Sequence, residues 1–390
     1  MRTDTTHRFE ALDGVRGVAA LCVLIDHFGQ ILDVYWPPNV FLAVDVFFMM
    51  SGFVIAHAYG SRLRAGLPAW TYLARRFIRL YPMFIASLLI GAAVLCYGAT
   101  KGVIEYPARD IVRSVALNAL YVPFLNASRV IGDFGQIFPA DPPAWSLFLE
   151  ILGSAGFLLL FGLGRKALLT ISGLWYAVLV IAGIFFARVK GDAWIDLNNG
   201  YDSTNFLGGL PRVGFAFTLG LVLQGLLRDG FGAGAVATLV RRVPYPSFML
   251  YALLLAMLLF PKSARGIYPM LAVSTLVPAM VFLGAHIRTR AGLETNIARF
   301  LGWMSYPLFC LHVPVIRLVI FAQGGVIASP TRTMAISGLV TLACVVVLTK
   351  CYEEPLRRVL TARLRGSKKE RSSAPNPARG IAPGPHFIEK

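Results

Sequence analysis

The chain has 390 residues, of which 56% are hydrophobic and only 15% are charged, and its mean hydropathy is +0.65. Soluble domains carry about 25% charged residues, so this composition excludes a soluble globular protein and indicates a polytopic membrane protein. The net charge of +17 does not indicate nucleic-acid binding, because the basic residues are scattered between apolar runs and form no continuous stripe. The five cysteines show no CxxC spacing and lie in or beside apolar segments, which predicts neither a disulfide framework nor a metal site.

Ten apolar runs of membrane-spanning length follow one another and predict an all-α bundle of about ten transmembrane helices. Several of them contain Gly, Pro or a charged residue, which interior-facing transmembrane helices tolerate. The seventh run is short for a span, so it is expected to tilt or to be partly re-entrant. The runs are 15–34, 40–59, 80–98, 144–162, 168–187, 205–226, 245–260, 267–286, 300–320 and 333–351.

The distribution of Lys and Arg predicts how the bundle is oriented. If both termini lie on one side, that side holds most of the 37 basic residues, including five arginines in the loop at 62–79. Positive charge collects in cytoplasmic loops, so we expect a multi-pass protein of the cytoplasmic membrane with both termini cytoplasmic. The outward segment 99–143 is expected to form a small cap. Residues 361–390 are basic and rich in Pro, Gly and Ser, which predicts a disordered tail after a membrane domain at 1–360.

The polar residues Arg16, Asp26 and His27 lie in the first span. Arg16 and His27 are separated by about three turns of helix, so their side chains share one face about 16 Å apart. This spacing puts the guanidinium near one membrane surface and the imidazole deep in the bilayer, beside Asp26. A charge at the bilayer centre costs about 2.5–3.5 kcal/mol on insertion scales, which favours a position facing the protein interior or a water-filled path. The alternative is a pair that only packs helices.

The second span contains Asp45 near its outer end and the small residues Ser51-Gly52 within a run of bulky side chains. A carboxylate at this depth needs a cation, and His27 or an arginine could supply it. The sequence leaves open whether Asp45 belongs to a functional site. Ser51-Gly52 favours close packing of helices through small side chains, and no GxSxG motif supports a serine nucleophile.

The segment RRFIRLYP, residues 75–82, contains Arg75, Arg76 and Arg79. Arg76 and Arg79 are three residues apart at the start of a helix, so they project together. Two guanidiniums at a membrane surface suit a bidentate phosphate clamp. The alternative is the anchoring of a helix end by cytoplasmic positive charge, which explains most such arginines.

Three later spans contain isolated polar residues. Glu150 lies in WSLFLE and is either salt-bridged for folding or part of a site. Arg212 begins a span from the outer side, where the default expectation is a structural partner for a carboxylate. His312 lies in SYPLFCLH, and a single His on an apolar helix is more often a hydrogen-bonded core residue than a catalyst.

Six motifs, taken in this order, resemble those of the acyltransferase-3 integral membrane acyltransferases, which are often O-acetylases. The motifs are LDGVRGVAALCVLIDH, VDVFFMMSGFVI, RRFIRLYP, WSLFLE, SYPLFCLH and EEPLRR, and the resemblance covers residues 9–358. It implies about ten spans, an N-terminus inside the cell, and transfer of an acyl group to a hydroxyl of a glycan or other acceptor. The acyl group implied is usually acetyl, from cytoplasmic acetyl-CoA. Roles are implied for Arg16 and His27, and for the three arginines of RRFIRLYP near the coenzyme.

The implied reaction needs a base, because a hydroxyl has a pKa far above 7. His27 is the expected general base, since imidazole is the side chain whose proton affinity suits neutral pH. Asp26 or Asp45 would orient the ring or stabilise its charged form. Glu150 is a further catalytic candidate.

The remaining polar residues receive supporting roles in this interpretation. Arg16 and the RRFIRLYP arginines would hold the phosphates of acyl-CoA, and Ser51, Arg212 and His312 would support the site. The expected partners are the lipid bilayer, acyl-CoA and a hydroxyl acceptor. Neither a metal nor a nucleic acid is expected. The competing class is a transporter or flippase, since charges inside a ten-helix bundle also suit a substrate or proton path.

Overall fold

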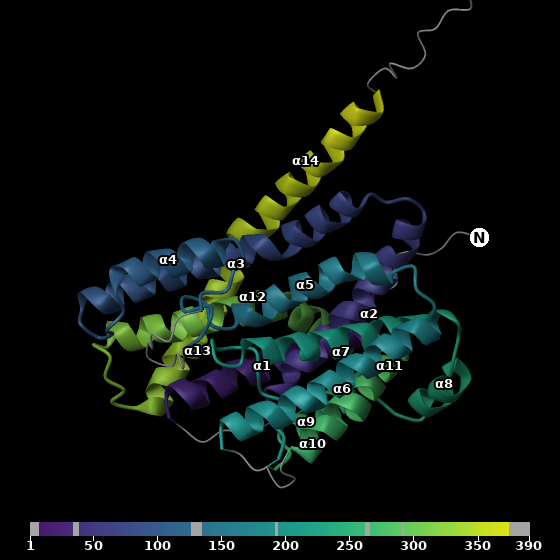
Figure 1. Ribbon diagram of the computed structural model, residues 1–390, viewed down its shortest axis with the longest axis horizontal. Coiled ribbons are helices and arrows are strands. Elements are labelled where there is room, and N and C mark those ends of the chain that lie inside the picture. The colour runs from purple at the N-terminus through teal and green to yellow at the C-terminus, as the bar shows by residue number, and fades with distance from the viewer. Residues whose placement is uncertain are drawn as a thin grey trace, which may run out of the picture.

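The computed structural model describes residues 8–33, 39–125, 135–191, 194–261, 266–290 and 292–373. Within these ranges the chain is a bundle of helices (Figure 1), and its one β pairing is an isolated bridge between Gln136 and Asp202. The α-helices are α1 (Glu10–Ile31), α2 (Leu42–Arg64), α3 (Ala69–Thr100), α4 (Ala108–Ala119), α5 (Ala144–Leu160), α6 (Arg165–Val189), α7 (Gly209–Arg228), α8 (Ala233–Arg241), α9 (Pro246–Leu258), α10 (Ile267–Leu271), α11 (Val277–His286), α12 (Leu293–Ala322), α13 (Pro330–Leu348) and α14 (Glu354–Ser373). Short turns precede α7, α11 and α14: the 3₁₀ turn η1 (Phe206–Gly208) and the π turns η2 (Ala272–Leu276) and η3 (Thr349–Glu353).

Seven helical segments in the described ranges are long and apolar enough to cross a membrane. They are Leu42–Arg64, Ala69–Thr100, Arg165–Val189, Phe206–Arg228, Ile267–His286, Leu293–Ala322 and Pro330–Arg365. The other three expected spans are helical too, but α5 and α9 are shorter and α1 contains four charged residues. The expected all-α polytopic fold is therefore confirmed, and about ten remains an approximate count of its spans.

The helices that carry the polar motifs occupy the interior of the bundle. The apolar part of α12 is 89% buried, whereas those of α6 and α13 are only 22% buried and form the periphery. α1 packs mainly on α12, and α2 packs mainly on α7. The buried residues Asp45, Arg212 and Arg317 therefore lie on the three most buried of the seven apolar segments, where other groups can pair with them.

Glycines allow these two helix pairs to approach closely. A Cβ on Gly17 would lie 2.3 Å from the Cβ of Leu301, at the contact of α1 with α12. A Cβ on Gly52 would lie 2.2 Å from the carbonyl oxygen of Phe217, at the contact of α2 with α7. The interpretation of Ser51-Gly52 as a close-packing site is confirmed at Gly52.

A proline inside α12 fixes that helix against α3. Pro314 has no N–H, so the carbonyl of Cys310 loses its helical donor. The hydroxyl of Ser87 on α3 donates to this carbonyl at 2.7 Å. The carbonyl left without its helical donor in α12 thus accepts a hydrogen bond from a side chain of a neighbouring span.

The C-terminal segment differs from the expected tail. α14 projects away from the bundle (Figure 1) and continues to Ser373, well beyond the expected boundary at residue 360. Its sequence is rich in Leu, Arg and Lys, which favour helix. Residues 374–390 of the expected tail lie outside the described part of the chain.

Candidate functional site

A cavity of about 870 Å³ lies among α1, α2, α3, α5 and α12. It opens at the end of the bundle where α1 begins and α2 ends, which we call the arginine end. Arg62, Arg64 and Arg228 are exposed there. Its volume lies within the range of about 300–1,000 Å³ typical of small-molecule sites.

The cavity is lined by more arginines than carboxylates. Eight arginines face four carboxylates on its described lining, an excess of four positive charges. The arginines are Arg8, Arg16, Arg62, Arg64, Arg76, Arg79, Arg228 and Arg357, and the carboxylates are Asp13, Glu150, Glu353 and Glu354. A concave surface of one charge between low-dielectric walls attracts ligands of the opposite charge, so this cavity is suited to an anion.

Arg76 lies in the interior of the cavity and is held in place by α5. Its Nη2 lies 2.7 Å from Oε1 of Glu150, and its Nε donates to the Ser154 hydroxyl at 3.3 Å. The Ser51 hydroxyl on α2 donates to the same Glu150 oxygen at 2.8 Å. The structure therefore brings together three residues that the sequence singled out separately, with Glu150 as the shared acceptor.

Arg16 reaches the cavity from α1 and is held between two neighbours. Its Nη2 donates to the Ser305 hydroxyl at 3.1 Å, and its Nη1 lies 3.8 Å from a carboxylate oxygen of Asp13. Ser305 in turn donates to the carbonyl of Gly302 at 2.9 Å. These contacts fix the direction of the guanidinium.

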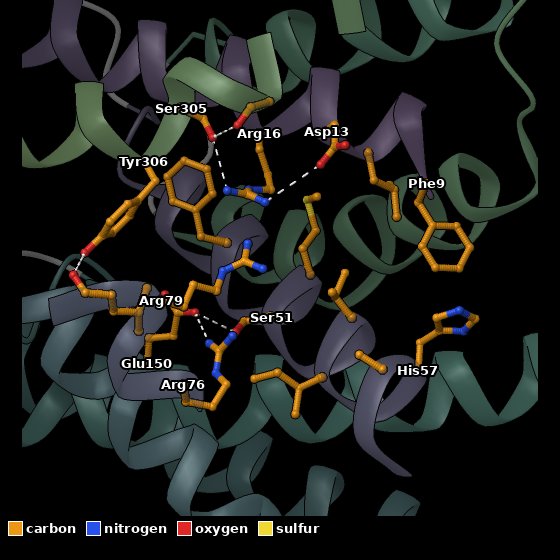
Figure 2. A pocket seen from close by; sticks show the side chains of 18 of the residues that line it. Phe9, Asp13, Arg16, Ser51, His57, Arg76, Arg79, Glu150, Ser305 and Tyr306 are labelled. Carbon is orange, nitrogen blue, oxygen red and sulfur yellow. Dashed lines mark hydrogen bonds and ion pairs between the residues drawn. The ribbon is translucent and has the colours of Figure 1, made fainter. Parts of the chain in front are cut away.

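Arg79 is the least compensated of the interior arginines. Figure 2 shows its side chain directed into the space between Arg16 and Arg76. Arg16 has Asp13 and Arg76 has Glu150, but Arg79 makes no ion pair with any residue that the structure describes. Asp13 and Glu150 each form an ion pair with one of the three guanidiniums, so Arg79 can pair with an anionic ligand.

Arg75 is not brought to this cavity. It precedes Arg76 on α3, and consecutive residues of a helix point about 100° apart. Arg76 and Arg79 line the cavity and Arg75 does not, so only the two arginines that are three residues apart share the predicted face.

Asp45 and Arg212 form a buried ion pair at the opposite end of α2. Arg212 Nε and Nη2 lie 3.1 and 2.7 Å from the two carboxylate oxygens of Asp45. Arg212 also donates to the carbonyls of Phe41 and Asn199 at 3.0 Å. Arg212 is therefore the structural partner that the sequence predicts, and Asp45 is engaged by it and not by His27.

His27 lies beyond the cavity and contacts His312. Neither histidine is among the described lining residues. His27 Nδ1 lies 2.9 Å from the Val23 carbonyl oxygen and 3.2 Å from His312 Nε2. Asp26 accepts a hydrogen bond from Gln30 at 2.7 Å, so neither expected carboxylate is the hydrogen-bond partner of the His27 ring.

An aromatic ring connects the cavity to the histidine pair. Phe309 lines the cavity and contacts the ring of Phe47 edge-on, with centroids 5.6 Å apart. The centroid of the same Phe309 ring lies 6.0 Å from that of His312. His27 and His312 are therefore one aromatic ring beyond the interior of the cavity.

The sequence interpretation missed several lining residues. Ser305 and Phe309 precede His312 by seven and three residues in SYPLFCLH, and this helical spacing could have placed all three on one face. Arg357 lies in EEPLRR and pairs with Glu353 at 3.0 Å. Arg8 has no comparable signal, because it reaches the cavity through the fold of the chain before α1.

Comparison with known proteins identifies the family. The family described as "Acyltransferase domain" (Acyl_transf_3) matches residues 9–350. The chain belongs to this acyltransferase family. It is similar to acyltransferase MdmB of Streptomyces mycarofaciens, with 27% identity over 419 aligned residues that cover 96% of this chain and 97% of that protein. It is also similar to Protein 2 in the picA locus of Rhizobium radiobacter, with 37% identity over 162 residues, 40% of this chain and 83% of that protein. No solved structure matches.

Membership of the acyltransferase family decides between the two classes that the sequence left in competition. The protein is an enzyme of the transferase class, and its apolar helices make it a multi-pass membrane protein. An acyltransferase takes an acyl group from a donor and passes it to an acceptor such as a hydroxyl. The cavity at the arginine end and the His27–His312 contact beyond it are the features of the described chain to compare with such a reaction.

Proposed function

We propose that this acyltransferase takes its acyl group from acyl-CoA bound in the arginine-lined cavity and transfers it to a hydroxyl, with His27 as general base. The observation that carries the proposal is the excess of arginine over carboxylate on a cavity of about 870 Å³. CoA carries its phosphates at one end and its thioester at the end of a long flexible arm. Exposed arginines at the opening, followed by Met50, Phe47 and Phe309 inside, suit that distribution of charge.

The chemistry assigned to His27 is proton removal. As the acceptor oxygen attacks the thioester carbonyl, His27 takes the hydroxyl proton, the new carbon–oxygen bond forms, and the carbon–sulfur bond breaks. CoA leaves as its thiolate and takes up a proton in solution. Because Phe309 lies between the cavity and the histidine pair, the ring of Phe309 must yield for the acyl group to reach His27.

We further propose acetyl as the acyl group, a glycan hydroxyl as the acceptor, and the cytoplasmic membrane as the location. The family resemblance supports the first two, and the positive-inside rule supports a cytoplasmic arginine end. Arg8 and Arg357, near the two ends of the described chain, both line the same cavity. In this arrangement acyl-CoA binds from the cytoplasm and the acyl group passes along the bundle towards the outer side.

The test separates donor binding from turnover in purified protein reconstituted into liposomes. Binding and consumption of radiolabelled acetyl-CoA are measured for the wild type and for His27→Ala. We expect binding to be retained and turnover to fall by about 10²–10⁴-fold, the usual contribution of a general base. His286→Ala is the control, because His286 hydrogen-bonds to the Phe282 carbonyl of its own helix, at 2.8 Å, packs against the Phe282 ring and does not line the cavity. Near-normal turnover in well-folded His27→Ala would rule out the base role.

A further inference from the structure

We propose that His312 is a positioning residue, which orients His27 and stabilises the cation formed when His27 takes a proton. The inference rests on the proposed function, since it gives the proposed base its partner. His312 lies on α12 and is completely buried, and its Nε2 is 3.2 Å from Nδ1 of His27 on α1. The two ring centroids are 4.8 Å apart at an interplanar angle of 67°.

Two backbone carbonyls determine which nitrogen of each ring carries hydrogen. His312 Nδ1 lies 2.9 Å from the Leu308 carbonyl oxygen, and His27 Nδ1 lies 2.9 Å from the Val23 carbonyl oxygen. A carbonyl oxygen can only accept, so both Nδ1 atoms must donate. A neutral imidazole carries one hydrogen, which leaves both Nε2 atoms as acceptors.

The hydrogen bond between the rings then has one possible direction, with His27 as donor and His312 as acceptor. The N–H at Nδ1 of His27 donates to Val23 and also faces the lone pair of His312 Nε2. A hydrogen on His312 Nε2 would point at this N–H, so His312 must stay neutral. The basic nitrogen left on the pair is Nε2 of His27, which is the atom that a general base needs.

A neutral acceptor is suited to this position. When His27 Nε2 takes a proton, its Nδ1–H becomes a stronger donor, and His312 can receive it without placing a second charge in the bilayer interior. The two carboxylates expected to act on His27 are engaged elsewhere, Asp26 by Gln30 and Asp45 by Arg212. Arg317, which follows His312 on α12 and donates to the Pro139 carbonyl, adds a positive charge on the same helix. That charge opposes a second proton on the pair.

Two amide substitutions that differ by one methylene isolate the contact. In His312→Asn the amide can still donate to the Leu308 carbonyl but is too short to reach His27. In His312→Gln the amide oxygen can take the place of Nε2 and accept from His27. We expect the Asn variant to lose about 10–100-fold in kcat, as is typical when a group that orients a metal-ligating histidine is removed. The Gln variant should recover much of the loss, and KM for acetyl-CoA should change little in either.

A spectroscopic measurement reports the contact independently of activity. The chain has six histidines, so ¹⁵N-histidine labelling in bilayers gives a simple spectrum in which His27→Ala assigns the His27 signals. We expect one protonated and one unprotonated nitrogen on His27 in the wild type. The protonated signal should shift in His312→Asn and return towards its wild-type position in His312→Gln. His286→Asn is the matched control and should alter neither kcat nor the His27 signals.

The outcomes distinguish the inference from the proposed function. A wild-type kcat in His312→Asn, or equal losses in the Asn and Gln variants, would overturn the positioning role while leaving His27 as base. Wild-type turnover in His27→Ala would overturn the base role itself. Unchanged His27 signals in His312→Asn would show that the two rings do not share a hydrogen bond. This outcome would overturn the positioning role whatever the activity of the variant.

Discussion

Arg16 donates a hydrogen bond to Ser305 at 3.1 Å, and the same two helices bring His27 to 3.2 Å from His312. On α1 the two functional residues are about three turns apart, and on α12 their partners are about two turns apart. Arg16 and His27 therefore share one face of α1, and Ser305 and His312 share one face of α12. The long Arg16 side chain makes up the difference of about one turn between the two spacings. α12 supports both residues that the first sequence motif singles out.

Replacement of Ser305 by Ala removes the acceptor of the Arg16 hydrogen bond. We expect acyl-CoA binding to weaken by about 2–10-fold, because a hydrogen bond contributes about 0.5–1.5 kcal/mol, and kcat to change less. Equilibrium binding and KM measure the effect. Ser337→Ala on α13 removes another buried hydroxyl and is the control. Unchanged binding in Ser305→Ala would mean that Arg16 is held without Ser305.

Arg79→Ala should weaken acyl-CoA binding with little effect on stability. Arg79 points into the cavity and has no ion-pair partner among the described residues, so a bound phosphate is the interaction that the substitution removes. The salt dependence of binding should also become less steep. Arg79→Lys should restore part of the affinity, since a point charge lacks the two-oxygen contact. Arg75→Ala, one residue outside the lining, is the control.

Arg76→Ala should lower both binding and the free energy of unfolding. Arg76 pairs with Glu150 at 2.7 Å, and its removal leaves Ser51 as the hydrogen-bond donor to this carboxylate among the described residues. We expect a loss of about 1–3 kcal/mol, below the range for fully buried pairs because Glu150 faces the cavity. Thermal unfolding in detergent measures the loss, and Glu150→Gln in the same background should relieve it. An Arg76→Ala protein as stable as the wild type would contradict the structural role.

Breaking the Asp45–Arg212 pair should destabilise the bundle more than it affects chemistry. The two side chains are 3% and 0% exposed, so removing one leaves an uncompensated buried charge, at a cost of about 3–5 kcal/mol. Thermal unfolding of Arg212→Gln, Asp45→Asn and the double variant measures the coupling. We expect the double variant to lose less than the sum of the single ones. Loss of turnover in a fully stable Asp45→Asn protein would instead place Asp45 in the reaction.

The buried carboxyl of Asp141 should make the free energy of unfolding decrease as pH rises. Burial raises the pKa of this carboxyl to about 8, and the nearby Ser87 and Arg317 oppose the shift only in part. The folded state therefore keeps a proton that the unfolded chain loses near its usual value of 3.8. Between about pH 4 and pH 8 the contribution to stability falls by up to about 1.4 kcal/mol per pH unit. Asp141→Asn should flatten the slope of thermal unfolding against pH, whereas Asn in place of the exposed Asp229 should not.

Cysteine labelling tests the proposed orientation. In a background without the five native cysteines, single cysteines replace Arg64 at the arginine end and Glu105 after α3. Impermeant thiol reagents applied to intact cells should label position 105 and spare position 64. The reverse pattern would put the arginine end outside. Labelling of both would show that α3 does not separate them across the membrane.

Helical periodicity was sufficient to predict which residues lie together when those residues belong to the same helix. The spacing of Arg76 and Arg79 predicted that they project together, and both line the cavity, whereas Arg75, which the sequence interpretation also assigned to the coenzyme, does not. The face shared by Arg16 and His27 was also visible in the sequence. These predictions succeed because an α-helix has a fixed angle per residue.

Partners from different helices could not be predicted in this way. The cation for Asp45 is 167 residues away, and the neighbour of His27 is 285 residues away. Both depend on which helices pack together, which no local pattern specifies. For the same reason Glu150 and Ser51 remained separate candidates until the contact of α2 with α5 brought them to one guanidinium.

The position of Phe309 also bears on how the membrane stays intact. A water-accessible cavity that extends to the middle of α12 shortens the apolar barrier across the bilayer. The rings of Phe47 and Phe309 restore it, since neither can carry a proton or hydrate an ion. In the proposed reaction, this aromatic contact keeps protons from passing between the arginines and the histidines of the resting enzyme, and it shields a bound thioester from hydrolysis at His27. The proton gradient across the membrane and the supply of acyl donor would then both be protected by the same aromatic contact.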